Sequence, residues 1–277
     1  MESLRPILSA HLLRRVDSLL VELLRSLGAD DWEAQTIAPQ WKVKDIAAHL
    51  LDTQLRKLAI VRDGYRAEAP EIRSPADLVS FVRRLNQEGV RVYRRLSSQV
   101  LISLLEAGSL QSADFHESLD PFATALFGVS WAGEDTSPNW FDTARELTER
   151  WHHQEQIRLA VKRPGIITRE LYHPVLDCFM RALPHHYGEV AAAPGTLLQF
   201  DISGDCGGTW LLERDANTWR LVGQSPAAVR ARVTVPQEIA WRIFTKGISQ
   251  AAAASQVEAE GDRELGLHIL GMTAIVG

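Results

Sequence analysis

The sequence has only two cysteines, no excess of basic residues and no long uninterrupted apolar run. Cys178 and Cys206 lie far apart without a paired spacing, which argues against a disulfide framework or a thiolate metal site and suits a reducing compartment. The formal net charge is -5 and the basic residues are scattered, so nucleic acid is not an expected partner. The Leu-rich stretch near the N-terminus is interrupted by charged residues from Arg14 to Glu22, which argues against a signal peptide or a membrane span. We therefore expect a cytoplasmic protein that binds neither nucleic acid nor membrane.

The length and composition favour two globular domains. The chain has 277 residues, of which 45% are hydrophobic and 23% are charged, and this is ordinary for globular proteins but long for one core. The composition changes at "AAAPG", residues 191–195, which is typical of a linker. We predict a helical domain over residues 1–190 and a small α+β domain over residues 195–277.

Amphipathic helices are predicted throughout the first domain. They are expected over residues 11–28, from after Trp41 to about residue 65, from Ser74 onward, over about 140–161 and, in a shorter form, over 169–183. The last of these contains Pro174, so it is either kinked or begins late. Four long helices with buried leucine faces favour a helical bundle over about residues 5–183.

The second domain is predicted to combine strands and helices. Short segments rich in β-forming residues, separated by turn-like segments, occupy residues 196–203, 208–214, 218–222 and 229–235. Helical patterns return over residues 236–249 and 263–272. This order predicts a small α+β domain.

Two of the predicted helices carry histidines beside other potential metal ligands. In "TERWHHQEQIR", residues 148–158, Glu149 and His153 are four residues apart and therefore share one helix face. If this helix and the one carrying His49 both face the bundle interior, His49, Glu149 and His153 converge on one divalent metal ion. Two imidazoles and one carboxylate suit zinc and leave a fourth position open, as in catalytic sites.

The sequence alone leaves other interpretations of these histidines open. His152 is three residues from Glu149 and also shares its face, so spacing does not choose between His152 and His153. Each histidine is equally compatible with a hydrogen-bonded or solvent-facing role that involves no metal.

Other residues near the candidate ligands have supporting roles in this prediction. Asp45 and Asp52 flank His49 on its helix and are candidates to accept a hydrogen bond from its second ring nitrogen, although Asp45 also suits a helix N-terminus. The tryptophans close to the candidate ligands are expected to be packing residues: Trp41, Trp140 and Trp151.

The segment "TIAPQWKVKDIAAHLLD" resembles the signature Thr-x-x-Pro-x-Trp-Ser/Thr-Val-x-Asp-Ile/Leu-x-Ala-His-Leu of DinB-like bundles, specifically the mycothiol-dependent maleylpyruvate isomerase group. The resemblance implies a DinB-like four-helix bundle whose metal ligands fall on His49, Glu149 and His153. It departs from the signature at Lys42, where the group has a Ser or Thr that caps the helix. From "DISGDCGGTWLLER" onward, the chain is similar to the sterol-carrier-like domain that follows these bundles.

The same resemblance implies thiol chemistry. A zinc ion (or another divalent metal) with an open position binds a low-molecular-weight thiol such as mycothiol as the thiolate. The thiol then serves in isomerisation or S-transfer on a small electrophilic substrate such as maleylpyruvate. Arg242, in "AWRIFTKG", is a candidate for holding a substrate carboxylate, with a solvated helix residue as the open alternative. A second copy of the chain, forming a homodimer, is a further candidate partner.

Two other functions remain open. In the first alternative, the protein is a carrier for an apolar ligand and its metal site is vestigial. In the second, the metal is bound but has only a structural role. A cavity lined by apolar side chains within residues 196–277 would favour the carrier, whereas an open metal position facing a cleft between the domains would favour the enzyme.

Overall fold

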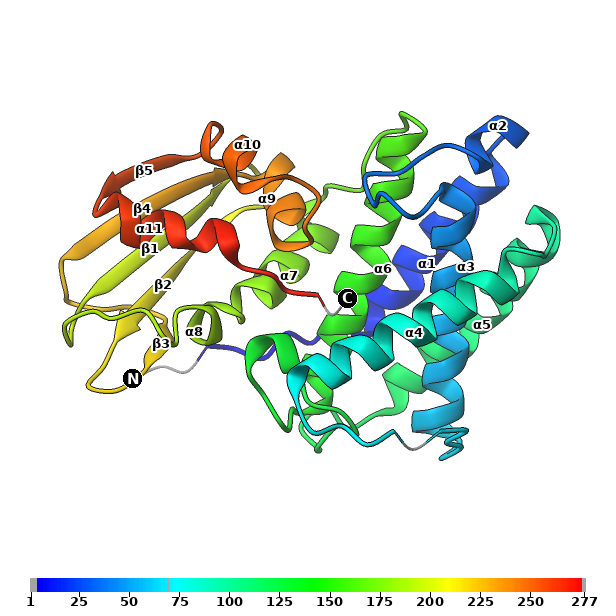
Figure 1. The fold of residues 1–277 in the computed structure, drawn as a ribbon, viewed down its shortest axis with the longest axis horizontal. Coiled ribbons are helices and arrows are strands. Elements are labelled where there is room, and N and C mark those ends of the chain that lie inside the picture. Colours follow the sequence, from blue (N-terminus) through cyan, green and yellow to red (C-terminus); the bar gives the residue numbers. More distant parts are fainter. Residues whose placement is uncertain (1–3, 69, 276–277) are drawn as a thin grey trace.

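The computed structural model describes residues 4–68 and 70–275, in which long helices form one part and a sheet with shorter helices forms the other (Figure 1). The helical elements of the first part are α1 (Ala10–Arg25), α2 (Ala29–Trp32), α3 (Val43–Lys57), α4 (Pro75–Tyr93), α5 (Ser98–Ser118), α6 (Asn139–Ala160), α7 (Arg169–Met180) and α8 (Leu183–His186). A π-helical turn, Leu58–Arg62, extends α3, and a 3-10 turn, Ser130–Ala132, precedes α6. Within the described residues, no helix is both long enough and apolar enough to cross a membrane.

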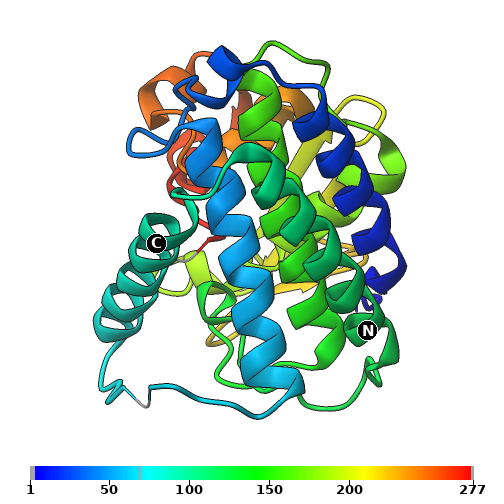
Figure 2. The ribbon, with the colours of Figure 1, turned by 90° about the vertical axis from the view of Figure 1, so that its right-hand side faces the viewer.

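Helices α1, α3, α5 and α6 pack against one another around a core of aliphatic side chains. This core contains Leu24 of α1, Ile46 of α3, Leu105 of α5 and Ile157 of α6, all at most 1% exposed. Helix α4 packs on α3 and stands to one side of the other long helices (Figure 2). It approaches α3 closely at Gly89, where a Cβ atom would lie 2.2 Å from the carboxyl carbon of Asp52, so a larger residue there would displace the Asp52 side chain.

The helix boundaries differ from the predicted ones in two places. The helix predicted from Ser74 is confirmed, with Ser74 Oγ accepting a hydrogen bond from Asp77 N, but it ends at Tyr93. A separate helix, α5, follows it and was not predicted; its N-cap is Ser97, whose hydroxyl accepts from Val100 N. Pro174 lies inside α7, whose helix begins at Arg169.

The second part contains one five-stranded sheet of order β3-β2-β1-β4-β5. Its strands are β1 (Leu197–Ser203), β2 (Gly208–Arg214), β3 (Trp219–Val222), β4 (Val229–Pro236) and β5 (Glu258–Gly261). Strands β1 and β4 are parallel, and every other pair is antiparallel. The remaining elements are α9 (Gln237–Phe244), α10 (Gln250–Ala254), α11 (Arg263–Leu267) and the 3-10 turn His268–Gly271. The four predicted strands are confirmed, whereas β5 and α10 were not predicted.

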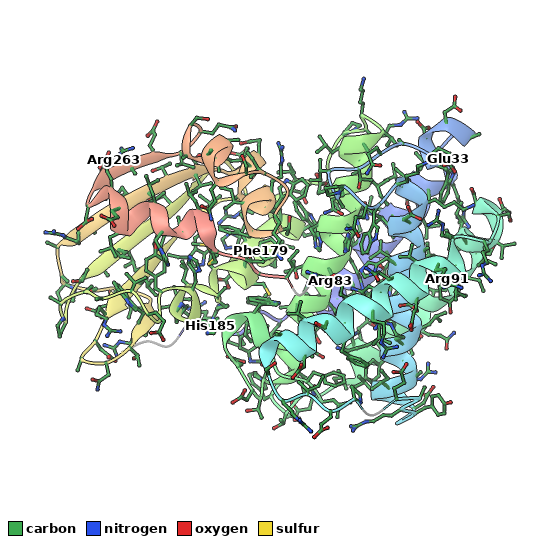
Figure 3. The ribbon with its side chains drawn as sticks, viewed as in Figure 1. Glu33, Arg83, Arg91, Phe179, His185 and Arg263 are labelled. Atoms are coloured by element: carbon green, nitrogen blue, oxygen red, sulfur yellow. The ribbon has the colours of Figure 1, made fainter. Side chains whose placement is uncertain are left out.

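A single hydrophobic cluster connects the long helices with the sheet. Trp151 of α6 stacks flat on Tyr172 of α7, with ring centroids 4.2 Å apart, and the Tyr172 hydroxyl donates to the Gln237 carbonyl at the start of α9. Phe179 of α7, labelled in Figure 3, is fully buried and belongs to the same cluster as Phe200 of β1. The two parts therefore share a core, and the predicted division at residues 190–195 stays a prediction.

Both cysteines are free, as expected for a chain without disulfides. Cys178 is buried in α7, and burial raises the pKa of its thiol far above the usual value. Burial also raises the pKa of Cys206. Both side chains are therefore protonated and unreactive near neutral pH, so the protein's own thiols are poor nucleophiles.

Candidate metal centre

Helices α3 and α6 carry the three predicted metal ligands and pack directly on each other. His49 lies in the middle of α3, whose start is held by a hydrogen bond from Lys42 N to Asp45 Oδ2 of 3.0 Å. This bond satisfies the backbone N–H of Lys42, whereas the Ser or Thr hydroxyl that would accept from the first turn is absent there. Glu149 and His153 lie one turn apart on α6, as their spacing predicts.

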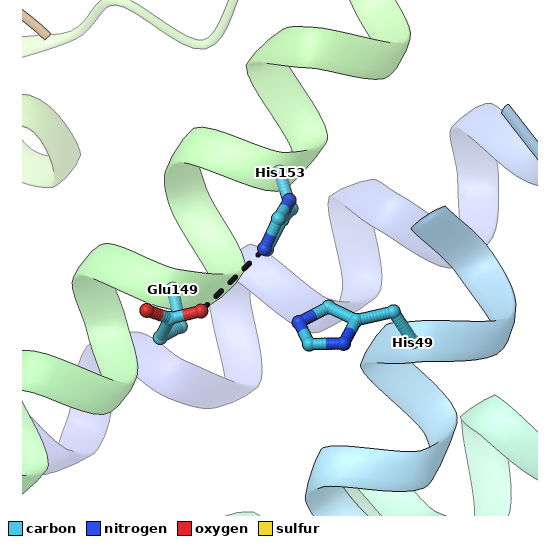
Figure 4. A group of neighbouring side chains, drawn as sticks. All are labelled: His49, Glu149 and His153. Carbon is cyan, nitrogen blue, oxygen red and sulfur yellow. Dashed lines mark ion pairs between the residues drawn. The ribbon is translucent and has the colours of Figure 1, made fainter. Parts of the chain in front are cut away.

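The structure brings His49, Glu149 and His153 together (Figure 4). One potential ligand atom from each of them lies within 4.8 Å of the other two. His153 Nε2 is 3.5 Å from Glu149 Oε2, and the rings of His49 and His153 meet edge-to-face with centroids 4.8 Å apart. The arrangement has two nitrogen donors and one carboxylate, which is the donor set that zinc binds in open, catalytic sites. Their role as ligands stays a prediction.

A hydrogen bond from His153 to Gln156 sets the orientation of one imidazole. His153 Nδ1 lies 2.9 Å from Gln156 Oε1, and because that oxygen can only accept, Nδ1 carries the proton. The lone pair of His153 is therefore on Nε2, the nitrogen that faces Glu149. Gln156 was missed by the sequence analysis, although its position one turn after His153 is a signal for it.

The predicted carboxylate partners of His49 bind elsewhere. Asp45 accepts from Lys42 N, and Asp52 pairs with Arg56 Nε at 2.7 Å, which corrects the expectation that either of them orients His49. His49 Nδ1 is buried and has no hydrogen-bond partner among the described residues. Its other ring nitrogen points toward Glu149 and His153 (Figure 4).

His152 is close to the three clustered side chains but outside their group. Its Nδ1 lies 2.7 Å from the Thr148 carbonyl, so it donates to the backbone one turn earlier. Its ring lies 4.0 Å from that of His153, and it also borders the cavity described below. The geometry thus favours His153 over His152 as the candidate ligand. The His152 ring is held in place by its hydrogen bond to the backbone.

Burial favours the neutral forms of His49 and His152, and the neighbouring histidines favour the ionised form of Glu149. Desolvation lowers the pKa of His49 well below its usual value and that of His152 to about 3, with further lowering from His153. Burial acts to raise the pKa of Glu149, but the neighbouring histidines lower it to about 2. Neutral imidazole and ionised carboxylate are the forms that bind a metal cation.

A cavity of about 540 Å³ opens onto the three side chains. The first part of the chain lines it with the segment 37–41 and His49, with Arg83, Asn86 and Gln87 of α4, and with Glu149, His152, His153 and Gln156 of α6. The second part lines it with Thr245, Lys246, Gly247 and Ile275. Trp41, predicted to be a packing residue, lies 4.6 Å from the His49 ring and 5.7 Å from the His153 ring and lines the cavity as well. Both parts of the chain therefore contribute to the walls around the candidate ligands.

Arg242, the predicted carboxylate-binding residue, is half-buried on α9 and is not among the residues that line this cavity. Its Nε atom is buried without a hydrogen-bond partner among the described residues. The cavity is lined instead by the residues that follow α9, including Lys246, which the sequence analysis passed over. A contact of Arg242 with a substrate stays a prediction.

Comparisons with known proteins add a family and a fold. Residues 13–158, more than half of the chain, match the family model described as the mycothiol maleylpyruvate isomerase N-terminal domain. Two crystal structures, of the mycothiol-dependent maleylpyruvate isomerase and of a mutant of it, are similar to this one with TM-scores of 0.54 and 0.52. Each is 12% identical in sequence, covering 92% of this chain and 93% of the other. At this identity the likeness concerns the fold. No curated protein matches the sequence.

Proposed function

The chain belongs to the family of the mycothiol maleylpyruvate isomerase N-terminal domain, and from this premise we propose that it is a metal-dependent, thiol-using enzyme. Its cofactors would be zinc, or another divalent metal, and a low-molecular-weight thiol such as mycothiol. Its reaction would be isomerisation or S-transfer on a small electrophilic substrate such as maleylpyruvate. The observation that carries the proposal is the clustering of His49, Glu149 and His153 at the wall of a cavity shared by both parts of the chain.

The residues present fit a zinc ion. His49, Glu149 and His153 would hold it, with His49 neutral and Glu149 ionised near neutral pH. The hydrogen bond from His153 Nδ1 to Gln156 directs Nε2 toward the other two ligands. His153 Nε2 lies 3.5 Å from Glu149 Oε2, and Arg145, one turn earlier on α6, also acts electrostatically on Glu149.

The protein would contribute binding and shielding to the reaction. Zinc with an open position binds a thiol as the thiolate, so that the thiol is a nucleophile at neutral pH. The indole of Trp41 covers the imidazoles on one side, and the cavity beside them has the volume of a typical small-molecule site. A purely structural metal is less well supported, because structural zinc sites are closed by four protein ligands.

The proposal extends to the two domains. Helices α1, α3, α5 and α6 would be the DinB-like four-helix bundle, within a domain of residues 1–190. Residues 195–277 would be the sterol-carrier-like domain. We infer a cytoplasmic location from the thiol chemistry, since low-molecular-weight thiols and free cysteines belong to reducing compartments.

The carrier function has one observation in its favour. A second cavity, of about 560 Å³, lies between residues 4–12, α7, and strands β2 and β3. Its walls include Ile7, Trp210 and Val222, which are apolar. It is not enclosed by residues 196–277 alone, however, and it lies away from the candidate ligands, so the carrier remains the second candidate.

Substitution of His49 tests the enzyme proposal, because local spacing brings together only Glu149 and His153. We expect His49→Ala to lose stoichiometric zinc and all thiol-dependent activity while keeping its circular dichroism spectrum. His152→Ala is the control and should retain nearly all of the bound zinc. Metal analysis of the purified variants, followed by titration with candidate thiols, gives the readout. Full zinc occupancy in His49→Ala would refute the proposed site.

A further inference from the structure

A third cavity, of about 270 Å³, lies at the start of α1. Its walls come from residues 8–11, from the end of α5 and the loop after it, and from the first residues of α6. The start of α1 therefore lies beside the end of α5 (Figure 2). None of the described residues lines both this cavity and the one around His49, Glu149 and His153. The third cavity is thus a separate place in the fold, to which the proposed function gives no role.

Ser9, the N-cap of α1, does not cap its own helix. Its hydroxyl is buried and has no hydrogen-bond partner among the described residues. The N–H groups of Ala10 and His11, the first two of the helix, likewise donate to no described residue. The other serine N-caps of the described helices each accept a hydrogen bond from the backbone N–H three residues later; they are Ser74, Ser97 and Ser249. The start of α1 therefore keeps donors that the protein itself leaves unpaired.

His116 of α5 supplies a second buried polar atom that lacks a partner. The residue is 2% exposed, and its Nδ1 lies 3.1 Å from Thr143 Oγ1. Its Nε2 is buried and has no hydrogen-bond partner among the described residues. Buried polar atoms are almost always hydrogen-bonded, because an unpaired one destabilises the fold. Ser9 and His116 come from different helices and both line this cavity, which indicates that a bound group completes the site.

The unpaired groups around the cavity are hydrogen-bond donors. The N–H groups at the start of a helix carry partial positive charge and favour oxyanions. No acidic residue in the first turn of α1 satisfies them. The Ser9 hydroxyl can donate, and so can His116 Nε2 when the Thr143 hydroxyl donates to Nδ1. A ligand that pairs with all of these groups must offer several oxygen acceptors.

The carboxylates near the cavity are already paired within the fold. Glu117 lines the cavity and lies 3.0 Å from the guanidinium of Arg14. Asp142 and Glu146 act electrostatically on His116 from α6, and each of them has both a lysine and an arginine partner. The negative charge around the cavity is therefore balanced by the chain's own cations, which leaves the unpaired donors free to favour an anion.

We propose that this cavity binds a small oxyanion, whose oxygens accept hydrogen bonds from the first N–H groups of α1, from the Ser9 hydroxyl and from His116 Nε2. Carboxylates and inorganic phosphate share this chemistry, and the volume of the cavity is below that of sites for drug-sized ligands. Thr143 and Glu149 lie about 9 Å apart along the α6 axis, at 1.5 Å per residue. The site is therefore separate from the candidate metal centre, and it goes beyond the proposed function.

The test titrates acetate and, separately, inorganic phosphate into the metal-free full chain at an ionic strength held constant with chloride. Metal-free protein is used so that neither ion binds to zinc. The readouts are the ¹⁵N signals of the His116 ring, assigned by their absence from His116→Gln, and the Tm. We expect a saturable shift of the Nε2 signal and a Tm that rises with the oxyanion concentration, because the ion binds the folded chain. The ion that binds more tightly identifies the source as a carboxylate or a phosphate.

The variants separate binding from helix capping. Ser9→Ala and His116→Phe should each weaken oxyanion binding about 10- to 100-fold, as for loss of one hydrogen bond to a charged group. His116→Gln keeps an amide N–H near the Nε2 position and should bind within several-fold of wild type. Ser97→Ala is the matched control, because Ser97 caps its own helix. It should lower the Tm by about 2–4 °C and bind the oxyanion as wild type does.

Ser9→Ala should show the reverse pattern, with a nearly unchanged Tm in the absence of oxyanions, because its hydroxyl has no partner to lose. If neither ion shifts the His116 signals of wild type, the cavity holds water only and the proposal is overturned. An equal loss of affinity in Ser97→Ala would also overturn it. His49→Ala should bind the oxyanion as wild type does. Oxyanion binding in a protein that takes up no zinc would leave this site standing while the metal site falls.

Discussion

Helix α6 contributes to two buried polar clusters, which differ in how their charges are balanced. In the first, here called the compensated cluster, each carboxylate meets an ammonium or guanidinium group; its members are Asp17, Lys57, Asp142, Arg145, Glu146 and Arg150. Lys57 Nζ, for example, lies 2.5 Å from Asp142 Oδ2 and 3.4 Å from Glu146 Oε1. In the second, Glu149 lies beside the imidazoles of His49 and His153, and the group opens onto a cavity.

The difference indicates what each cluster requires. A buried charge is costly unless it is paired, and the compensated cluster pairs its charges within the fold. The second cluster places a carboxylate beside two imidazoles, and under the proposed function a bound metal ion would balance its negative charge. Substitutions in the first cluster should therefore affect stability, and substitutions in the second should affect metal binding.

The largest expected effect is on stability and comes from Arg150→Met. Arg150 is 2% exposed, bridges to Asp17 and donates to Ser112 Oγ at 2.6 Å. Its loss leaves Asp17 buried without its partner, which typically costs about 3–5 kcal/mol of unfolding free energy. Urea denaturation measures this change. Arg14→Met, which breaks exposed pairs between Arg14 of α1 and both Asp114 and Glu117 of α5, is the control and should change stability little. If Arg150→Met also reduced the zinc affinity, this would contradict the expectation that the compensated cluster affects stability and only the second cluster affects metal binding.

A smaller effect concerns pH and His116, which lies beside the compensated cluster. Burial lowers the pKa of His116 to about 4, and its Nδ1 lies 3.1 Å from Thr143 Oγ1. Above pH 6.5 the imidazole is neutral in both states. As the pH falls from 6.5 toward 4, His116 binds a proton in the unfolded chain but not in the folded chain. The free energy of unfolding therefore falls by about 3 kcal/mol.

His116→Gln removes this titratable group, so the unfolding free energy of the variant should fall less between pH 6.5 and pH 4 than that of wild type. The measurement is the difference in unfolding free energy between wild type and variant at pH 7, 5.5 and 4, in metal-free protein. A difference that does not change with pH would show that His116 has the same pKa in the folded and unfolded states, against this prediction.

The smallest expected effect concerns metal binding by the second cluster and tests the role of Gln156. Gln156→Ala removes the acceptor that orients His153, and loss of such a partner typically weakens metal binding about 10- to 100-fold. Gln154→Ala is a matched control, because Gln154 is a buried glutamine of the same helix that donates to the Val16 carbonyl of α1. It should keep its zinc affinity and lose stability. Competition with a chromophoric chelator gives the affinities, and equal zinc affinity in both variants would remove Gln156 from the site.

The predictable features were those with local causes. Glu149 and His153 share a face by helical period alone, and the strand pattern located β1 to β4. The contact of His49 with them spans a hundred residues, and the sequence suggested it only on the condition that both helices face the bundle interior, which the family resemblance supported. The break between α4 and α5 was missed, because Ser97 marks it without a proline or glycine. Strand β5 is short and polar, and pairing with β4 rather than its own pattern defines it.

Long-range packing was outside the reach of local patterns. Nothing in the local sequence around Lys57 indicates that Asp142 is its partner. The spacing around His49 suggested Asp45 or Asp52 as a hydrogen-bond partner, whereas His49 Nδ1 has no such partner among the described residues. The approach of Gly247 to Ile37 depends on how the two parts of the chain meet. Such contacts follow from tertiary structure.

The stacked rings of α6 and α7 continue into α9, since Trp151 also meets Trp241 edge-to-face with centroids 6.1 Å apart. The segment 191–195, by contrast, is mostly exposed. A chain cleaved in this segment would therefore remain a non-covalent complex, held by aromatic surface that neither fragment can cover alone. For the same reason, a fragment ending at residue 190 would present these rings to water and tend to aggregate, so the two fragments would need to be expressed together.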